Sequence, residues 1–245
     1  MKTLTLLFSL LICGFSFGQY YYYTSTGDTP GGINQDPAYP DGSGQVSGWT
    51  SLLGPSVDPV EWSAVQSIPF PFNFNGNPVT EYKVSSSGVL TFTTVAVSIP
   101  GTISASLPDA NIPDNSICIW GLNASGTNDN VSTKTFGSAG SQQQWIHFSS
   151  CVNGSIGWSY WSIVLEEGTN NIYIVDQRNT SGVGALSVGI QIDATTAISD
   201  PASPNVDATA GGSSTSEDDL FYTFIYGTQA QNEVKLNSFD LLPYI

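Results

Sequence analysis

The stretch IPFPFNFNGNPVTEYKVSSSGVLTF, residues 68–92, carries the clearest structural pattern in the chain. Its first half alternates apolar residues with proline and asparagine, the period-two pattern of a strand with one buried face; the apolar positions are Ile68, Phe70, Phe72 and Phe74. The Asn-Gly-Asn at 75–77 follows at once, and Asn-Gly is typical of tight hairpin turns. A second hairpin is expected around residues 85–88. The stretch therefore predicts antiparallel strands that bury phenylalanine.

Short strands of the same kind are expected along the rest of the chain. Turn-forming Gly, Pro, Asn and Asp residues separate these strands. The predicted strands are residues 20–23, 82–84, 89–94, 117–122, 144–149, 155–166, 171–176, 185–192, 220–226 and 233–241. No stretch has a sustained 3.6-residue apolar period, and no internal repeat is evident. The sequence thus predicts an all-β protein, an antiparallel β-sandwich (jelly-roll-like) of about ten to twelve strands.

The composition excludes several classes of protein. Charged residues make up 10% of the 245 residues, against about 25% in an ordinary globular domain. Five Lys and Arg face 20 Asp and Glu, so the formal net charge is −15. A nucleic-acid partner is therefore not expected, because binding phosphates requires clustered basic residues. Hydrophobic residues reach 40%, which is too many for an acidic disordered tail.

The N-terminus has the features of an export signal. Met1-Lys2 precedes a mostly apolar stretch at 4–17, and small residues at Ser16 and Gly18 provide a cleavage site. The stretch is shorter than the roughly 20 residues that span a bilayer. A lipid anchor on Cys13 is disfavoured because a large residue precedes it. The sequence predicts a signal peptide at residues 1–18.

This signal sets the expected domain organisation and location. Residues 19–228 are predicted to form the β-sandwich domain, and residues 229–245 a linker or the first strand of a missing following domain. No other window is apolar enough to cross a membrane, so no transmembrane span is expected after signal removal. We therefore expect a secreted protein, extracellular or at the cell surface.

Two cysteines, Cys118 and Cys151, remain after removal of the signal. An even number of cysteines in an exported chain favours a disulfide between them. The alternative is a pair of buried free thiols. A zinc site is disfavoured, because the two cysteines and His147 provide one ligand fewer than the usual four.

Three stretches resemble a known group of proteins. IPFPFNFNGNPVTEYKVSSSGVLTF (68–92), QWIHF (144–148) and WSIVLEEGTNNIYIVDQ (161–177) are similar to modules in secreted multidomain surface proteins of Bacteroidota, many of them cargo of type IX secretion. More loosely, they resemble N-terminal nidogen-like β-sandwich modules of extracellular proteins. The resemblance implies an adhesive or structural role. It brings no catalytic residues with it, since the shared residues are those of packing and turns.

The histidine and the acidic pair are the candidate catalytic residues. His147, the single histidine, lies on one strand face with Trp145 and Ser149, and no GxSxG motif accompanies it. Glu166 and Glu167 are adjacent, so their side chains point to opposite faces of a strand and cannot line one cleft. A partner carboxylate would have to be Asp176. We assign no catalytic residue, and both glutamates are expected at the edge of a hairpin turn.

Calcium is the most plausible ion for this chain, because hard oxygen ligands in loops bind it. The candidate loops are PDANIPDN (108–115), NASGTNDN (123–130) and SEDD (216–219). None has the EF-hand pattern, and acidic loops are often only solvated. The densest cluster, and hence the candidate ligand set, is Glu217, Asp218 and Asp219.

Aromatic residues of the segment GWSYWS (157–162) provide a candidate ligand-binding surface. If Trp161, with Ile163 and Leu165, points into the core, Trp158 and Tyr160 remain on the opposite face. Exposed rings bind the apolar faces of sugars, so these two residues could form a carbohydrate platform; the alternative is that both rings pack under a loop or against a neighbouring sheet.

Three function classes follow. The leading prediction is a secreted, non-catalytic adhesive or structural module, with an extracellular glycan or a surface protein as its partner. The second is a carbohydrate-binding module. The third is a secreted glycoside hydrolase or peptidase, which would require two carboxylates in one cleft about 5 to 9 Å apart.

Overall fold

A computed structural model describes residues 19–36, 48–95, 97–153, 156–179, 185–206 and 220–227. The predicted signal peptide (1–18), the predicted terminal segment (229–245) and the candidate calcium ligands Glu217, Asp218 and Asp219 lie outside these residues. Within the described part, no helix is long and apolar enough to cross a membrane.

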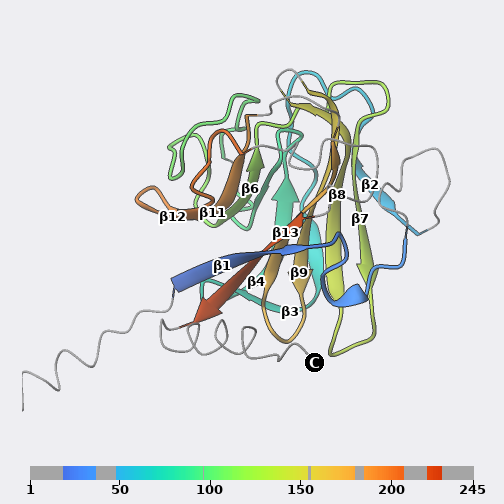
Figure 1. Ribbon diagram of the computed structural model, residues 1–245, viewed down its shortest axis with the longest axis vertical. Coiled ribbons are helices and arrows are strands. Elements are labelled where there is room, and N and C mark those ends of the chain that lie inside the picture. The colour runs from blue at the N-terminus through green and yellow to red at the C-terminus, as the bar shows by residue number, and fades with distance from the viewer. Residues whose placement is uncertain are drawn as a thin grey trace, which may run out of the picture.

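The described residues form thirteen strands in two antiparallel sheets, together with the short 3-10 helix η1 (Pro30–Gly32), which confirms the predicted all-β sandwich (Figure 1). The seven-stranded sheet has the order β1 (Gln19–Thr26), β13 (Leu220–Gly227), β10 (Ile172–Asn179), β9 (Ile156–Glu166), β8 (Gln143–Asn153), β7 (Asn130–Phe136) and β2 (Thr50–Leu53). The six-stranded sheet has the order β12 (Thr196–Ser199), β11 (Ser187–Asp193), β6 (Ser116–Trp120), β5 (Val89–Thr91), β4 (Asn77–Val84) and β3 (Gln66–Phe74).

The hairpin β3–β4 follows the alternation that the sequence shows. Every second residue of β3 from Ile68 to Phe74 is buried, and the residues between them are exposed. Asn75 and Gly76 both have positive φ, at 49° and 75°, as a type I′ hairpin turn requires. Two of the exposed residues are Pro69 and Pro71, which fit here because β3 is an edge strand and proline has no N–H to donate to a ladder.

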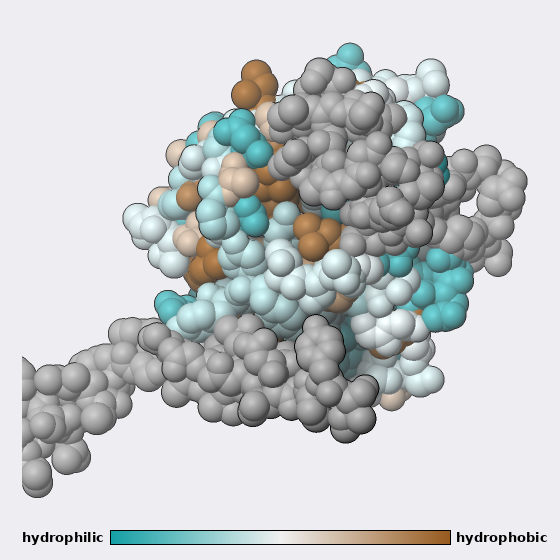
Figure 2. Space-filling view, viewed as in Figure 1, coloured by the Kyte–Doolittle hydropathy of each residue, from teal (hydrophilic) through white to brown (hydrophobic). Residues whose placement is uncertain are grey.

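The core lies between the two sheets. Inward-facing residues of β9 (Trp161, Ile163 and Leu165) belong to one buried cluster with Ile117 and Ile119 of β6. On the face shown in Figure 2, the coloured residues are mostly of intermediate hydropathy, with scattered hydrophilic and hydrophobic residues among them. Large apolar residues that are exposed in the described part are Val65, Val95, Ile99 and Ile103.

The turn at residues 85–88, SSSG, is buried, and its serines bond to the chain around it. The Ser85 amide donates to the Val89 carbonyl at 2.8 Å, and the Ser87 hydroxyl donates to the Pro100 carbonyl at 2.8 Å. Gly88 has a φ of 88°, and its carbonyl accepts from the Ile119 amide at 2.8 Å. A Cβ on Gly88 would lie 2.1 Å from the Ile119 carbonyl oxygen. The motif therefore connects β4 to β5 and fixes this turn against β6.

Gly88→Ala is expected to lower the free energy of unfolding by about 2 kcal/mol or more, because it adds a left-handed non-glycine residue and a backbone overlap. The measurement is urea unfolding followed by tryptophan fluorescence. Gly101→Ala is the matched control, since a Cβ there meets no atom within 4 Å, and it should change stability by less than about 0.5 kcal/mol. Equal effects of the two substitutions would contradict the account of this turn.

The predicted disulfide is wrong, because Cys118 and Cys151 are both free and buried. Alternation in β6 directs Ile117 and Ile119 into the main core and Cys118 to the outer face of its sheet, where it packs with Trp120 and Ile112. Cys151 of β8 lies in the main core between the sheets. The two thiols therefore lie on different sides of the six-stranded sheet. The alternative of buried free thiols is the one that the structure has.

Both thiols should be unreactive while the protein is folded, because burial raises the pKa of Cys118 and of Cys151 above that of a free cysteine. Alkylation with iodoacetamide followed by peptide mass spectrometry should leave both residues unmodified in native buffer. Both should be fully modified in guanidinium chloride without added reductant. Peptides that stay cross-linked after denaturation would contradict this expectation.

Candidate functional site

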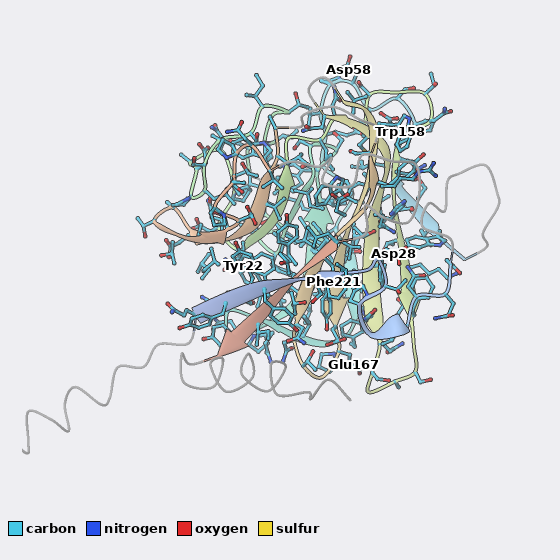
Figure 3. The ribbon with its side chains drawn as sticks, viewed as in Figure 1. Tyr22, Asp28, Asp58, Trp158, Glu167 and Phe221 are labelled. Atoms are coloured by element: carbon cyan, nitrogen blue, oxygen red, sulfur yellow. The ribbon has the colours of Figure 1, made fainter. Side chains whose placement is uncertain are left out.

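The outer face of the seven-stranded sheet carries a group of aromatic rings. Since Trp161 and the alternate residues after it fill the core, Trp158 and Tyr160 of β9 point the other way, as the sequence predicted for that case. Both side chains are partly exposed, and their ring centroids are 5.4 Å apart at an interplanar angle of 68°. The two rings thus form an edge-to-face pair. Figure 3 shows Trp158 at one end of the molecule, near the start of β9.

A bulge in β10 adds two polar side chains to this face. The register with β9 shifts between Asp176 and Arg178, which places Gln177 and Arg178 side by side on the outer face. The guanidinium carbon of Arg178 lies 5.2 Å from the centroid of the Trp158 ring, within the range of a cation–π contact. The Trp158 ring is therefore flanked by Tyr160 and by a cation.

His147 of β8 lies beneath these rings and is fully buried. Its ring is 5.7 Å from Trp49 and 6.1 Å from Tyr160, centroid to centroid. Its Nδ1 is 3.0 Å from both Ser162 Oγ and Gln177 Oε1, and Ser162 itself donates to Gln177 Oε1 at 2.6 Å. Because an amide oxygen only accepts, we assign the proton to Nδ1. Nε2 then has a free lone pair, and it has no hydrogen-bond partner.

Trp49 is held over this face by an ion pair. Its Nε1 donates to Asp36 Oδ2 at 2.8 Å, and Lys134 Nζ lies 2.6 Å from the same oxygen. Lys134 also lies 4.9 Å from the centroid of the Phe136 ring, which contacts Trp49 edge-on at 5.8 Å. Two of the five basic residues of the chain, Lys134 and Arg178, are thus placed among the aromatic rings of one face.

The acidic pair Glu166 and Glu167 is engaged in the turn after β9, at the opposite end of that strand from Trp158 (Figure 3). Glu166 accepts from Gln143 Nε2 at 3.0 Å and from the Tyr173 hydroxyl at 2.8 Å. Glu167 accepts from the amide of Gly140 at 2.7 Å. Asp176, the proposed partner, shares the inner face with Trp161 by register. These carboxylates do not meet in one cleft.

In each of the two candidate calcium loops that the structure describes, one carboxylate accepts a hydrogen bond from an amide of its own loop. Asp109 Oδ1 accepts from the amide of Asn111 at 2.8 Å, and Asp129 Oδ2 accepts from the amide of Gly126 at 2.7 Å. Burial raises the pKa of Asp129. Among the described residues, no group of three or more His, Cys, Asp or Glu side chains is arranged to hold a metal ion.

Trp49, Gln177 and Arg178 were not identified from the sequence. Trp49 follows a long Gly- and Pro-rich segment, and a tryptophan directly before a short strand is the signal that could have singled it out. Arg178 joins Gln177 on the outer face only through the bulge in β10, and the sequence has no mark of that bulge. The sequence predicted the strand face on which His147 lies. It assigned no catalytic role to this residue.

The stability of the protein should fall on acidification because of His147. Burial lowers the pKa of His147 to about 4, while an unfolded histidine titrates near about 6.5. Between these values only the unfolded state binds the proton, so stability is lost as the pH falls from about 6.5 to 4. The loss is about 3 kcal/mol, at about 1.4 kcal/mol per pKa unit.

The measurement is urea unfolding at pH 7 and pH 4 for the natural chain and for His147→Gln. Carboxylate titration is common to both proteins, so the difference in their pH dependence reports His147 alone. The variant should lose about 3 kcal/mol less than the natural chain between these pH values. The same pH dependence in both proteins would show that His147 is not buried in its neutral form.

Comparison with known proteins connects this fold to one family. Residues 44–227 match the family model described as NIDO related. No curated protein and no solved structure is significantly similar to the chain.

Proposed function

Because this chain belongs to the NIDO-related family, we propose that it is a non-catalytic extracellular module with an adhesive or structural role. One observation carries the proposal, namely the partly exposed rings of Trp49, Trp158 and Tyr160 on the outer face of one sheet. Exposed aromatic residues are a common feature of binding surfaces. The engagement of Glu166 and Glu167 in hydrogen bonds of a turn supports a role without acid–base chemistry.

Family membership suggests an extracellular-type protein, and we propose secretion through the N-terminal segment 1–18, with residues 19–228 as the mature β-sandwich domain. The similarity of residues 68–92 and 161–177 to modules of Bacteroidota surface proteins supports a multidomain cargo of type IX secretion. The acid excess supports the same location, since a high net charge keeps an exported module soluble.

Carbohydrate binding is the second candidate function, and the surroundings of Trp158 favour it. Its ring lies in an edge-to-face pair with Tyr160 and under the guanidinium of Arg178. A ring fixed in this way loses little conformational freedom on binding, which favours affinity. The apolar face of a sugar ring would then stack on the indole, with Arg178 donating hydrogen bonds to hydroxyl groups.

Beads coated with the full-length protein test the main proposal. They should attach to extracellular-matrix proteins, to insoluble polysaccharides or to cells, and the soluble protein should compete with them. Release of soluble sugars or peptides from these materials at a rate that depends on protein concentration would overturn the non-catalytic role. Failure to attach to any of these surfaces would overturn the adhesive role.

Trp158→Ala is expected to reduce attachment by about tenfold or more, because aromatic residues dominate binding surfaces. Since the side chain is partly exposed, its removal should leave the fluorescence-monitored fold and the ligand-free unfolding midpoint close to those of the natural chain. Ile103→Ala is the control, because Ile103 is a large residue that is 85% exposed and lies outside the aromatic face. An equal effect of both substitutions would contradict a role for Trp158.

A further inference from the structure

Three polar atoms next to the aromatic rings are buried and have no hydrogen-bond partner. They are His147 Nε2, Ser132 Oγ and Ser149 Oγ. Ser132 and His147 are directly opposed across β7 and β8, where cross-strand Cβ atoms are about 5 Å apart. Ser149 lies two residues beyond His147 on the same face of β8, a separation of about 7 Å. The three side chains therefore lie next to one another on the outer face of the sheet, and we call them the polar cluster.

Such a cluster has an energetic cost, because an unpartnered buried polar group loses its bonds to water. Native proteins leave few of these groups, and each calls for a bound partner or another explanation. All three side chains are at least nine-tenths buried, with exposed fractions of 4% for Ser132 and 0% for His147 and Ser149. The cluster thus provides three buried polar groups with which a bound group could pair.

The chemistry of the cluster selects a hydroxyl group. With its proton on Nδ1, His147 provides an acceptor at Nε2, while Ser132 and Ser149 each provide a donor and an acceptor. A carboxylate or phosphate is disfavoured, because its oxygens would face the lone pair of Nε2. The nearby Lys134 does not offset this repulsion, because it is paired with Asp36. An ammonium ion would lose its hydration for neutral acceptors only, because none of the three side chains is a carboxylate. A hydroxyl group can donate to Nε2 and accept from a serine.

The walls of the cluster suit the rest of a sugar. The rings of Trp49 and Tyr160 stand on two sides of His147, at 5.7 and 6.1 Å. Both rings are partly exposed, and a ligand can reach the buried atoms only if one of them turns aside. Aromatic faces pack well against the C–H groups of a pyranose, while its hydroxyl groups bond to the polar atoms between them.

We propose that His147, Ser132 and Ser149 form a binding site for one hydroxyl group of a neutral saccharide, bracketed by Trp49 and Tyr160. The proposal rests on the carbohydrate-binding function and adds its site and ligand class. Trp158 then forms the outer platform, and the cluster selects for uncharged sugars.

The test uses the full-length chain labelled with ¹⁵N-histidine. Because the chain has one histidine, its two ring nitrogens give an unambiguous spectrum. The probes are D-glucose, D-galactose and D-mannose, with D-glucuronate as the charged counterpart. At least one neutral sugar should shift the Nε2 resonance in a saturable way as that nitrogen accepts a hydrogen bond, and D-glucuronate should not.

Ser132→Ala and Ser149→Ala should each weaken this binding by about tenfold, as loss of one hydrogen bond predicts. Neither should lower the unfolding midpoint of the ligand-free protein, because each removes an unpartnered buried hydroxyl group. Replacing a serine with a purely structural role would instead lower the unfolding midpoint and leave sugar binding unchanged. Ser67→Ala, at an exposed position on β3, is the matched control and should change neither quantity.

The other outcomes overturn the proposal in distinguishable ways. An Nε2 that is hydrogen-bonded without sugar and insensitive to all probes indicates an internal water alone. Sugar binding that is lost in Trp158→Ala but intact in both serine variants retains the carbohydrate function and removes this site. Attachment to proteins without binding of any sugar removes the carbohydrate function and retains the adhesive role.

Discussion

The pairing of β8 with β9 is the interaction on which both the core and the aromatic face depend. Phe148 lies opposite Trp161 on the inner face, and His147 lies opposite Ser162 on the outer face. A shift of one residue would move every side chain of a strand to the other face. In β9 it would place Tyr160 in the apolar core and the Trp161 indole outside. The packing of the core therefore also fixes the position of the outer rings.

The bulge in β10 adds specificity to this arrangement. In a regular strand, only one of Gln177 and Arg178 could reach the outer face. With the register shift, both side chains reach the outer face. Gln177 therefore orients His147, and Arg178 contacts Trp158. In a chain with a net charge of −15, this positive charge beside an indole gives the face a local character unlike that of the whole molecule.

Much of the fold follows from strand periodicity alone. The alternation at 68–74 and the inward direction of Trp161 are local properties, so the sequence reveals them. The positions of Cys118 and Cys151 depend on which faces of two non-adjacent strands meet, and the prediction of a disulfide failed for that reason. Trp49 and Arg178 join the site through sheet order and a bulge, which are products of tertiary pairing. The sheet face on which Trp158 and Tyr160 lie could be predicted from the sequence, whereas the residues that surround them could not.

The two prolines of β3 affect how this module can meet other proteins. Pro69 and Pro71 lie on the outermost strand of the six-stranded sheet, and proline on an edge discourages the docking of a further strand. Recognition by extension of the sheet, in which backbone groups of a partner continue the ladder, is therefore disfavoured along β3. On this side, contacts must be made by side chains across a face, so specificity depends on residue identity rather than on backbone geometry.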